Sequence, residues 1–158
     1  MAVSHPLLIY TFVCLVHGIL LATVLYPKFS LYEEMARDML SETGRYQVIG
    51  GLISPTSDEY KKIGLISGAH RLAMCKLAVE DSDWIEVDGW EVLQPSYTRT
   101  LAVLRSVEAR IREQPRMDGV EILLLAGSDL IKSFEIPDAW SLEDVPPPPN
   151  HHVILLYS

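Results

Sequence analysis

The stretch Ser54–Arg71 (SPTSDEYKKIGLISGAHR) constrains the fold more than any other part of the chain. It follows a β-like apolar run, Gln47–Ile53, and leads into a helical pattern that starts at Ser67. A buried strand, a loop with paired lysines and a capped helix make a strand–loop–helix unit. In open α/β sheets such loops leave the carboxyl ends of the strands, where ligands bind. The segment therefore predicts both a sheet and the edge of that sheet that carries a site.

Positive charge is concentrated at the same place. Lys61, Lys62, Arg71 and Lys76 lie within Tyr60–Lys76, which contains no acidic residue, although the net charge of the chain is −8. An acidic protein that binds an anion has to gather positive charge locally. The sequence therefore predicts an anion site at this loop. The negative net charge and the lack of a basic stripe argue against nucleic-acid binding.

Strand and helix patterns alternate along the 158 residues. This alternation predicts an α/β fold with a doubly wound parallel sheet. The expected strands are Gln47–Ser54, Trp84–Asp88 and Val120–Ala126, and the expected helices are Phe29–Glu42, one from Ser67, Thr98–Gln114 and Gly127–Phe134. The residues expected to face the core are Leu31, Met35 and Met39 in the first helix, Leu72, Met74, Leu77 and Ala78 in the second, and Leu101, Leu104, Val107 and Ile111 in the third.

The N-terminal run Leu7–Tyr26 is apolar and carries no formal charge. One interpretation is a membrane-spanning helix, for which the run is long enough. The other is that Ile19–Tyr26 supplies the first buried strand, beside Gln47–Ser54, and we favour this one because the sheet would otherwise have a raw edge. The expected organisation is an apolar segment 1–30, a domain 31–145, and a Pro-rich break with a tail, 146–158.

The cysteines and histidines indicate no further site. Cys14 and Cys75 are far apart in unlike contexts, so neither a disulfide nor a zinc site is predicted. His70 is interpreted as structural, and His151 and His152 fall in the expected tail.

Three motifs resemble the eukaryotic, and above all the fungal, nicotinamide-mononucleotide adenylyltransferases. They are ISPTSDEYKKIGLISGAHR, WIEVDGWEVLQPSYTRTLAVL and LLLAGSDLIKSFEIPDAW, and they stand in the family's order between Met35 and Asp144. The resemblance implies a Rossmann-like nucleotidyltransferase fold and an enzyme of NAD biosynthesis. Such an enzyme joins the mononucleotide to the adenylyl group of ATP in the presence of Mg²⁺ and releases pyrophosphate. The resemblance also implies a nuclear or cytoplasmic location, with a membrane anchor at 7–26 as the alternative.

The resemblance carries mononucleotide-binding roles to five positions: Lys62, Tyr97, Thr100, Ala139 and Trp140. An electron-poor pyridinium ring stacks well on an aromatic face, which suits the aromatic positions. Gly127 and Asp129, which follow the expected strand Val120–Ala126, match nucleotide-binding positions of the family. Without the resemblance, the structural alternatives are solvated lysines, an aromatic lid over a helix start, a helix-capping aspartate and a core tryptophan. Trp90 is interpreted as a core residue.

Two departures from the family make the expected fold incomplete. No GSFNP-type glycine loop with a following histidine stands upstream of Met35, and no ISSTxxR segment stands before Ser158. Both elements hold ATP phosphates in the family, so impaired adenylyl transfer is expected. The alternatives are a non-catalytic nucleotide-binding variant, which could pair with a full-length homologue, and a membrane-tethered variant. The preference for the amide or the acid mononucleotide is left open.

Overall fold

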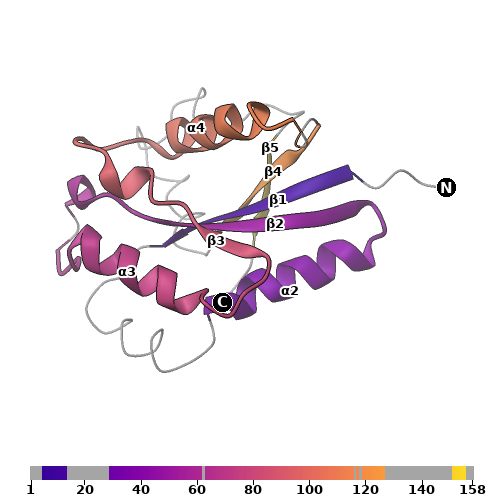
Figure 1. Ribbon diagram of the computed structural model, residues 1–158, viewed down its shortest axis with the longest axis horizontal. Coiled ribbons are helices and arrows are strands. Elements are labelled where there is room, and N and C mark those ends of the chain that lie inside the picture. The colour runs from indigo at the N-terminus through magenta and orange to yellow at the C-terminus, as the bar shows by residue number, and fades with distance from the viewer. Residues whose placement is uncertain are drawn as a thin grey trace.

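The computed structural model describes residues 5–13, 29–61, 63–115, 117, 119–126 and 151–155. Within these residues five parallel strands form one sheet in the order β3-β2-β1-β4-β5 (Figure 1). The strands are β1 (His5–Val13), β2 (Tyr46–Pro55), β3 (Ile85–Val87), β4 (Glu121–Ala126) and β5 (His151–Leu155). The doubly wound parallel sheet predicted from the alternating pattern is confirmed.

Helices cover both faces of the sheet. Figure 1 shows α4 on one face, and α2 and α3 on the opposite face. Their bounds are Phe29–Glu42 for α2, Gly68–Ala78 for α3 and Thr100–Arg112 for α4, with short 3-10 helices at Asp58–Tyr60 (η1) and Glu91–Leu93 (η2). The chain runs outward from β1 to β3 and then crosses over to β4, so the strand order reverses between β1 and β4. In such sheets the ligand crevice lies outside the carboxyl ends of the strands, at this reversal.

The two faces of β1 and β4 have separate apolar cores, because alternate residues of a strand point to opposite faces. On the α4 face the buried residues are Leu8, Tyr10, Ile122 and Leu124 from the strands, with Val103, Leu104, Val107 and Ile111 from α4. On the α2 face they are Leu7, Ile9, Leu123 and Leu125, with Ala36 and Leu40 from α2. Both strands are thus apolar on both faces, as expected of central parallel strands.

The first strand is not the predicted one. His5–Val13 pairs in parallel with β2 and fills the position that we expected Ile19–Tyr26 to take. Ile19–Tyr26 lies outside the described residues. A single membrane helix over the whole of 7–26 is also wrong, because Leu7–Val13 belong to β1. Among the residues that the structure describes, no helix has the length and apolar character needed to cross a membrane.

The expected C-terminal tail also contributes to the sheet. His151–Leu155 pair in parallel with Ile122–Ala126 and form β5. Segments 1–30 and 146–158 therefore each supply a strand to the sheet that is built mainly from 31–145.

The apolar stripe expected on α2 is wrong at Met35 and Met39, although the bounds of the helix are as predicted. Met35 and Met39 are exposed, whereas Ala36 and Leu40 are buried against the sheet. A small residue such as Ala36 lets the helix axis approach the strands closely. The helix ends as expected at Gly44, whose φ of 64° lies in the left-handed region that favours glycine.

The inner face of α3 also differs from the prediction. Its buried residues are Gly68, Arg71 and Cys75, while Leu77 is exposed. Arg71 occupies this face because it binds groups of the preceding loop, as described below. The stripe predicted for α4 is confirmed, since Leu101, Leu104, Val107 and Ile111 are all buried.

Candidate functional site at the carboxyl edge of the sheet

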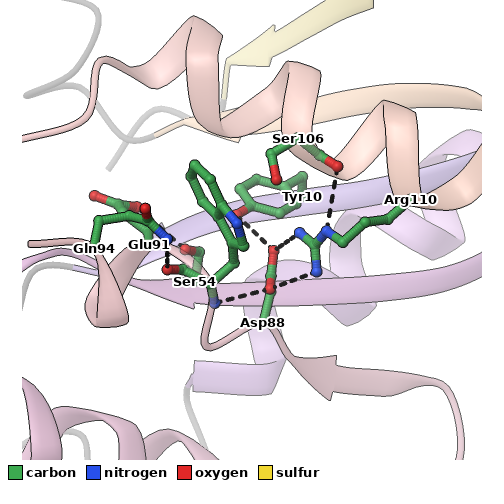
Figure 2. A network of polar contacts seen from close by, with 8 residues as sticks. Tyr10, Ser54, Asp88, Glu91, Gln94, Ser106 and Arg110 are labelled. Atoms are coloured by element: carbon green, nitrogen blue, oxygen red, sulfur yellow. Dashed lines mark hydrogen bonds and ion pairs between the residues drawn. The ribbon is translucent and has the colours of Figure 1, made fainter.

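The loops after β2 and β3 leave the same edge of the sheet, because the two strands are parallel neighbours. Polar side chains from β1, β2, the β3 loop and α4 form a network beneath these loops (Figure 2), and within it Tyr10, Ser54, Asp88 and Glu91 are buried. The residues that the figure labels in this network are Tyr10, Ser54, Asp88, Glu91, Gln94, Ser106 and Arg110. The network fixes the shape of the edge on which the predicted anion site lies.

Asp88 is one centre of the network. Its carboxylate receives two hydrogen bonds from the Arg110 guanidinium, at 3.0 and 2.6 Å. The backbone N–H of Trp90 donates to Oδ1 at 3.1 Å, and the Tyr10 hydroxyl donates to Oδ2 at 3.3 Å. The hydrogen bonds to Asp88 raise the pKa of Arg110, and burial raises the pKa of the Tyr10 phenol. Tyr10 therefore stays a neutral donor, and Asp88 ties β1, the β3 loop and α4 together.

Glu91 is the second centre. It is 4% exposed, and its Oε2 accepts a hydrogen bond from the Ser54 hydroxyl at 3.2 Å. Its Oε1 accepts one from the backbone N–H of Ser57 at 3.4 Å. Burial is the main cause that raises the pKa of Glu91 from 4.5 to about 7, with a further contribution from the nearby Asp88 charge. The hydrogen bonds from Ser57 and Ser54 and the charge of Arg71 act in the opposite direction.

Arg71 organises the loop between β2 and α3 from inside. Its side chain is 0% exposed, and its guanidinium donates to the backbone carbonyls of Ile66 and Thr56. It also lies 3.0 Å from Oδ1 of Asp58. The expectation that Arg71 contributes positive charge for an external anion is therefore wrong, because its charge is used within the fold.

Asp58, rather than the predicted Ser67, supplies the side-chain cap of α3. Its Oδ1 accepts a hydrogen bond from the backbone N–H of Gly68 at 2.7 Å. Ser67 makes no capping hydrogen bond, and its hydroxyl lies 2.7 Å from Nδ1 of His70. The carboxylate of Asp58 thus closes the loop on the helix that follows it.

Lys61, the first residue of the lysine pair, lies at the end of η1. Lys61 has a left-handed backbone, with φ of 52°, and its side chain is 80% exposed. Its ammonium lies 3.6 Å from the carboxylate of Glu59. An exposed pair of this kind contributes little to stability, so Lys61 is accessible to a ligand. Lys62 lies outside the described residues.

Thr100 is the first residue of α4, and Tyr97 lies just before this helix in the segment that leads to it from β3. Tyr97 is exposed and stacks on Tyr60 from η1, with ring centroids 6.1 Å apart and an interplanar angle of 27°. Thr100 is half-buried as the first residue of α4. The structure thus brings the predicted Tyr97 against the loop that carries the lysines. The other predicted positions, Gly127, Asp129, Ala139 and Trp140, lie outside the described residues.

Trp90 is half-buried and packs against the core on the α4 face, as the sequence predicts. Asp88, Glu91, Tyr10 and Arg110 were not predicted from the sequence to be site residues. One signal was available for Arg110, because it lies one and two helical turns after the buried Val107 and Val103, although its own side chain is 44% exposed. Among the residues that the structure describes, no cluster of three or more His, Cys, Asp or Glu side chains could hold a metal ion. Cys75 is a free, buried thiol whose pKa burial raises to about 11.

Comparison with known proteins places these loops within a family. Residues 32–145 match the cytidylyltransferase-like family model. The nicotinamide/nicotinic acid mononucleotide adenylyltransferase 1 of Saccharomyces cerevisiae is 45% identical over 130 residues, which cover 77% of this chain and 31% of the relative. The corresponding adenylyltransferase of Oryza sativa is 43% identical over 114 residues (71% and 45%), and adenylyltransferase 1 of Bos taurus is 36% identical over 148 residues (71% and 53%).

The chain thus spans from about a third to about half of the length of these curated relatives. The resemblance to mononucleotide adenylyltransferases, predicted from the three motifs, is confirmed. The matched stretch includes both edge loops and all of α2, α3 and α4 except the start of α2. Because this match covers most of the chain, the chain belongs to the cytidylyltransferase-like family.

Proposed function

We propose that the protein transfers the adenylyl group of ATP to nicotinamide or nicotinate mononucleotide. A phosphate oxygen of the mononucleotide attacks the α-phosphorus of ATP. The bond between this phosphorus and the oxygen that bridges the α- and β-phosphates breaks, and pyrophosphate leaves. The observation that carries the proposal is that the family match spans the two loops at the carboxyl edge of the sheet. The names of the relatives, which are nicotinamide/nicotinic acid mononucleotide adenylyltransferases, support these substrates.

The mononucleotide would bind through Lys62, Tyr97, Thr100, Ala139 and Trp140. The stack of Tyr97 on Tyr60 of the β2 loop supports this assignment. Reactions of this class need little covalent help from the protein, because positioning and neutralisation of phosphate charge supply most of the rate. A loop lysine such as Lys62 suits the second task.

Gly127 and Asp129, which follow β4 in the sequence, would bind nucleotide. Magnesium would arrive with ATP as part of the substrate. The described carboxylates at the edge support this, because Asp88 and Glu91 already accept hydrogen bonds from protein donors and fit a resident cation poorly. The nuclear or cytoplasmic location and the pairing with a homologue stay predictions.

We further propose that transfer is slow while mononucleotide binding is retained. The sequence between Val13 and Phe29 contains no GSFNP-type loop followed by a histidine. Loss of one donor to developing phosphate charge typically lowers kcat by about 10²–10³-fold.

The test is incubation of the purified chain with either mononucleotide, ATP and Mg²⁺, with coupled detection of the dinucleotide. We expect turnover well below about 1 per second, an ordinary enzymatic rate; a rate near that value would refute the impairment. Binding is measured by quenching of tryptophan fluorescence, which should disappear in Trp140→Ala and persist in the control Trp84→Phe. No binding of either mononucleotide at millimolar concentration, together with no dinucleotide, would refute the function.

A further inference from the structure

The loops after β2 and β3 are joined at one buried carboxylate. Glu91, in η2, accepts hydrogen bonds from the Ser54 hydroxyl at the end of β2 and from the backbone N–H of Ser57 in the following loop. Ser54 and Ser57 are 0% and 1% exposed. Removal of one partner of a buried hydrogen bond costs the full desolvation free energy of the other partner, because water cannot replace the lost partner.

Ser57 is the point from which the lysine loop is built. It is the N-cap of η1, and its hydroxyl accepts a hydrogen bond from the N–H of Glu59 at 3.2 Å. Its carbonyl accepts one from the N–H of Tyr60 at 3.1 Å. The left-handed Lys61 then ends η1. A shift of Ser57 therefore moves Tyr60 and Lys61 together.

The loop after β2 and the loop after β3 also meet in a second contact, the stack of Tyr60 on Tyr97. This outer contact is exposed, whereas the inner contact through Glu91 is buried. The buried contact is thus the one that fixes the relative position of the loops. Glu91 reaches this loop through its hydrogen bonds with the Ser54 hydroxyl and the backbone N–H of Ser57, so it would act through the backbone of Ser57.

The groups around Glu91 give its carboxylate a defined orientation. Arg71 on α3 attracts it, while Asp88 on the β3 loop repels it, and Tyr10 lies on the β1 side. The guanidinium of Arg71 also holds the carbonyl of Thr56, the residue before Ser57. Arg71 and Glu91 therefore bind the two sides of one peptide group, the one that joins Thr56 to Ser57.

We propose that Glu91 is a positioning residue that sets the place of the Ser57–Lys61 loop and thereby the affinity of the site for the mononucleotide. The second half of this proposal rests on the proposed function, whereas the first half concerns the ligand-free protein.

Two pairs of variants test the contact. Glu91→Leu removes both acceptors, and Glu91→Gln is its conservative counterpart, because the amide oxygen can accept from Ser57 while the amide NH₂ donates to the Ser54 oxygen. Ser57→Pro removes the single N–H that reaches Glu91, and the φ of −66° at Ser57 suits proline. Ser57→Ala is the control, since it keeps this N–H and loses only the hydroxyl.

The first measurement is hydrogen exchange at the Tyr60 and Lys61 amides of the ligand-free proteins. These amides donate to the carbonyls of Ser57 and Asp58 within η1. We expect exchange to be about tenfold faster in Glu91→Leu and Ser57→Pro than in Glu91→Gln and Ser57→Ala. Equal exchange within each pair would overturn the proposal, and Ser57→Pro keeps it testable if Glu91→Leu does not fold.

The second measurement is the dissociation constant of nicotinamide mononucleotide, followed by kcat and KM where turnover is measurable. We expect Glu91→Leu and Ser57→Pro to weaken binding about tenfold, with the kinetic effect mainly in KM. Glu91→Gln should bind with an affinity within about threefold of that of the unmodified protein. Unchanged affinity in folded Ser57→Pro would overturn the link to binding. If no protein binds the mononucleotide, the proposed function fails, and the exchange measurement still decides whether Glu91 positions the loop.

Discussion

Replacement of Glu91 by glutamine should make the stability of the protein less sensitive to pH. Burial is the main cause that raises the pKa of this carboxyl from 4.5 to about 7, so folding favours the protonated form. The contribution of Glu91 to stability is therefore fully present below pH 4.5. It is lost as the pH rises through about 7, because the buried group then has to ionise.

The size of the effect follows from the two pKa values. A carboxyl whose pKa rises from 4.5 to about 7 on folding destabilises the native state by about 3 kcal/mol when it is ionised. Glutamine has nearly the same shape and no proton to lose. The free energy of unfolding of Glu91→Gln, relative to the unmodified protein, should therefore increase by about 3 kcal/mol between pH 4.5 and pH 8.

Urea denaturation at pH 5, 6, 7 and 8, followed by circular dichroism, measures this difference. The matched control is Glu113→Gln, which replaces an exposed carboxyl at the end of α4. Its free-energy difference from the unmodified protein should stay constant within about 0.5 kcal/mol. A constant difference for Glu91→Gln over the same pH range would refute the argument that burial dominates at this carboxyl.

Two further substitutions test the contacts around the edge loops. Arg110→Gln should lower the free energy of unfolding by about 2 kcal/mol in urea denaturation, because it leaves the 4% exposed Asp88 side chain without its bidentate partner. The control Arg112→Gln breaks an exposed ion pair and should change this free energy by less than about 0.5 kcal/mol. Equal effects of the two substitutions would contradict the stabilising role of the Arg110–Asp88 pair. Gly68→Ala should lower the free energy of unfolding by about 1–3 kcal/mol, because the new Cβ would lie 2.6 Å from Cγ2 of Val92. Adding the substitution Val92→Ala should recover part of this loss. A Gly68→Ala protein as stable as the unmodified one would contradict the steric explanation.

Much of the fold could be predicted because local patterns and tertiary structure agree. The helix Phe29–Glu42 and the buried stripe of α4 follow from apolar spacing. The N-terminal strand was placed wrongly because both halves of Leu7–Tyr26 are apolar and β-like. Only pairing with β2 distinguishes them, and this register is a property of the whole sheet.

The site was predictable to a smaller extent. The loop after β2 and the position of Tyr97 could be located from the order of the elements and the family motifs. The roles of Arg71 and Glu91 could not, because a charged residue in a sequence looks exposed until its buried partners are known. Arg71 is fully buried because the carbonyls of the loop need a donor that water cannot supply.

The buried carboxylates also explain how an acidic chain can keep an anion site at this edge. Asp88 and Glu91 lie beneath the loops and would by themselves repel a phosphate. Arg110 neutralises Asp88 directly, and Arg71 lies near enough to Glu91 to lower its pKa. The acidic residues thus orient the loops while the arginines offset their charge, so that positive charge on the loop surface is left for the ligand. The same arrangement makes the arginines poor candidates for ligand contact, since each is already committed to a carboxylate of the fold.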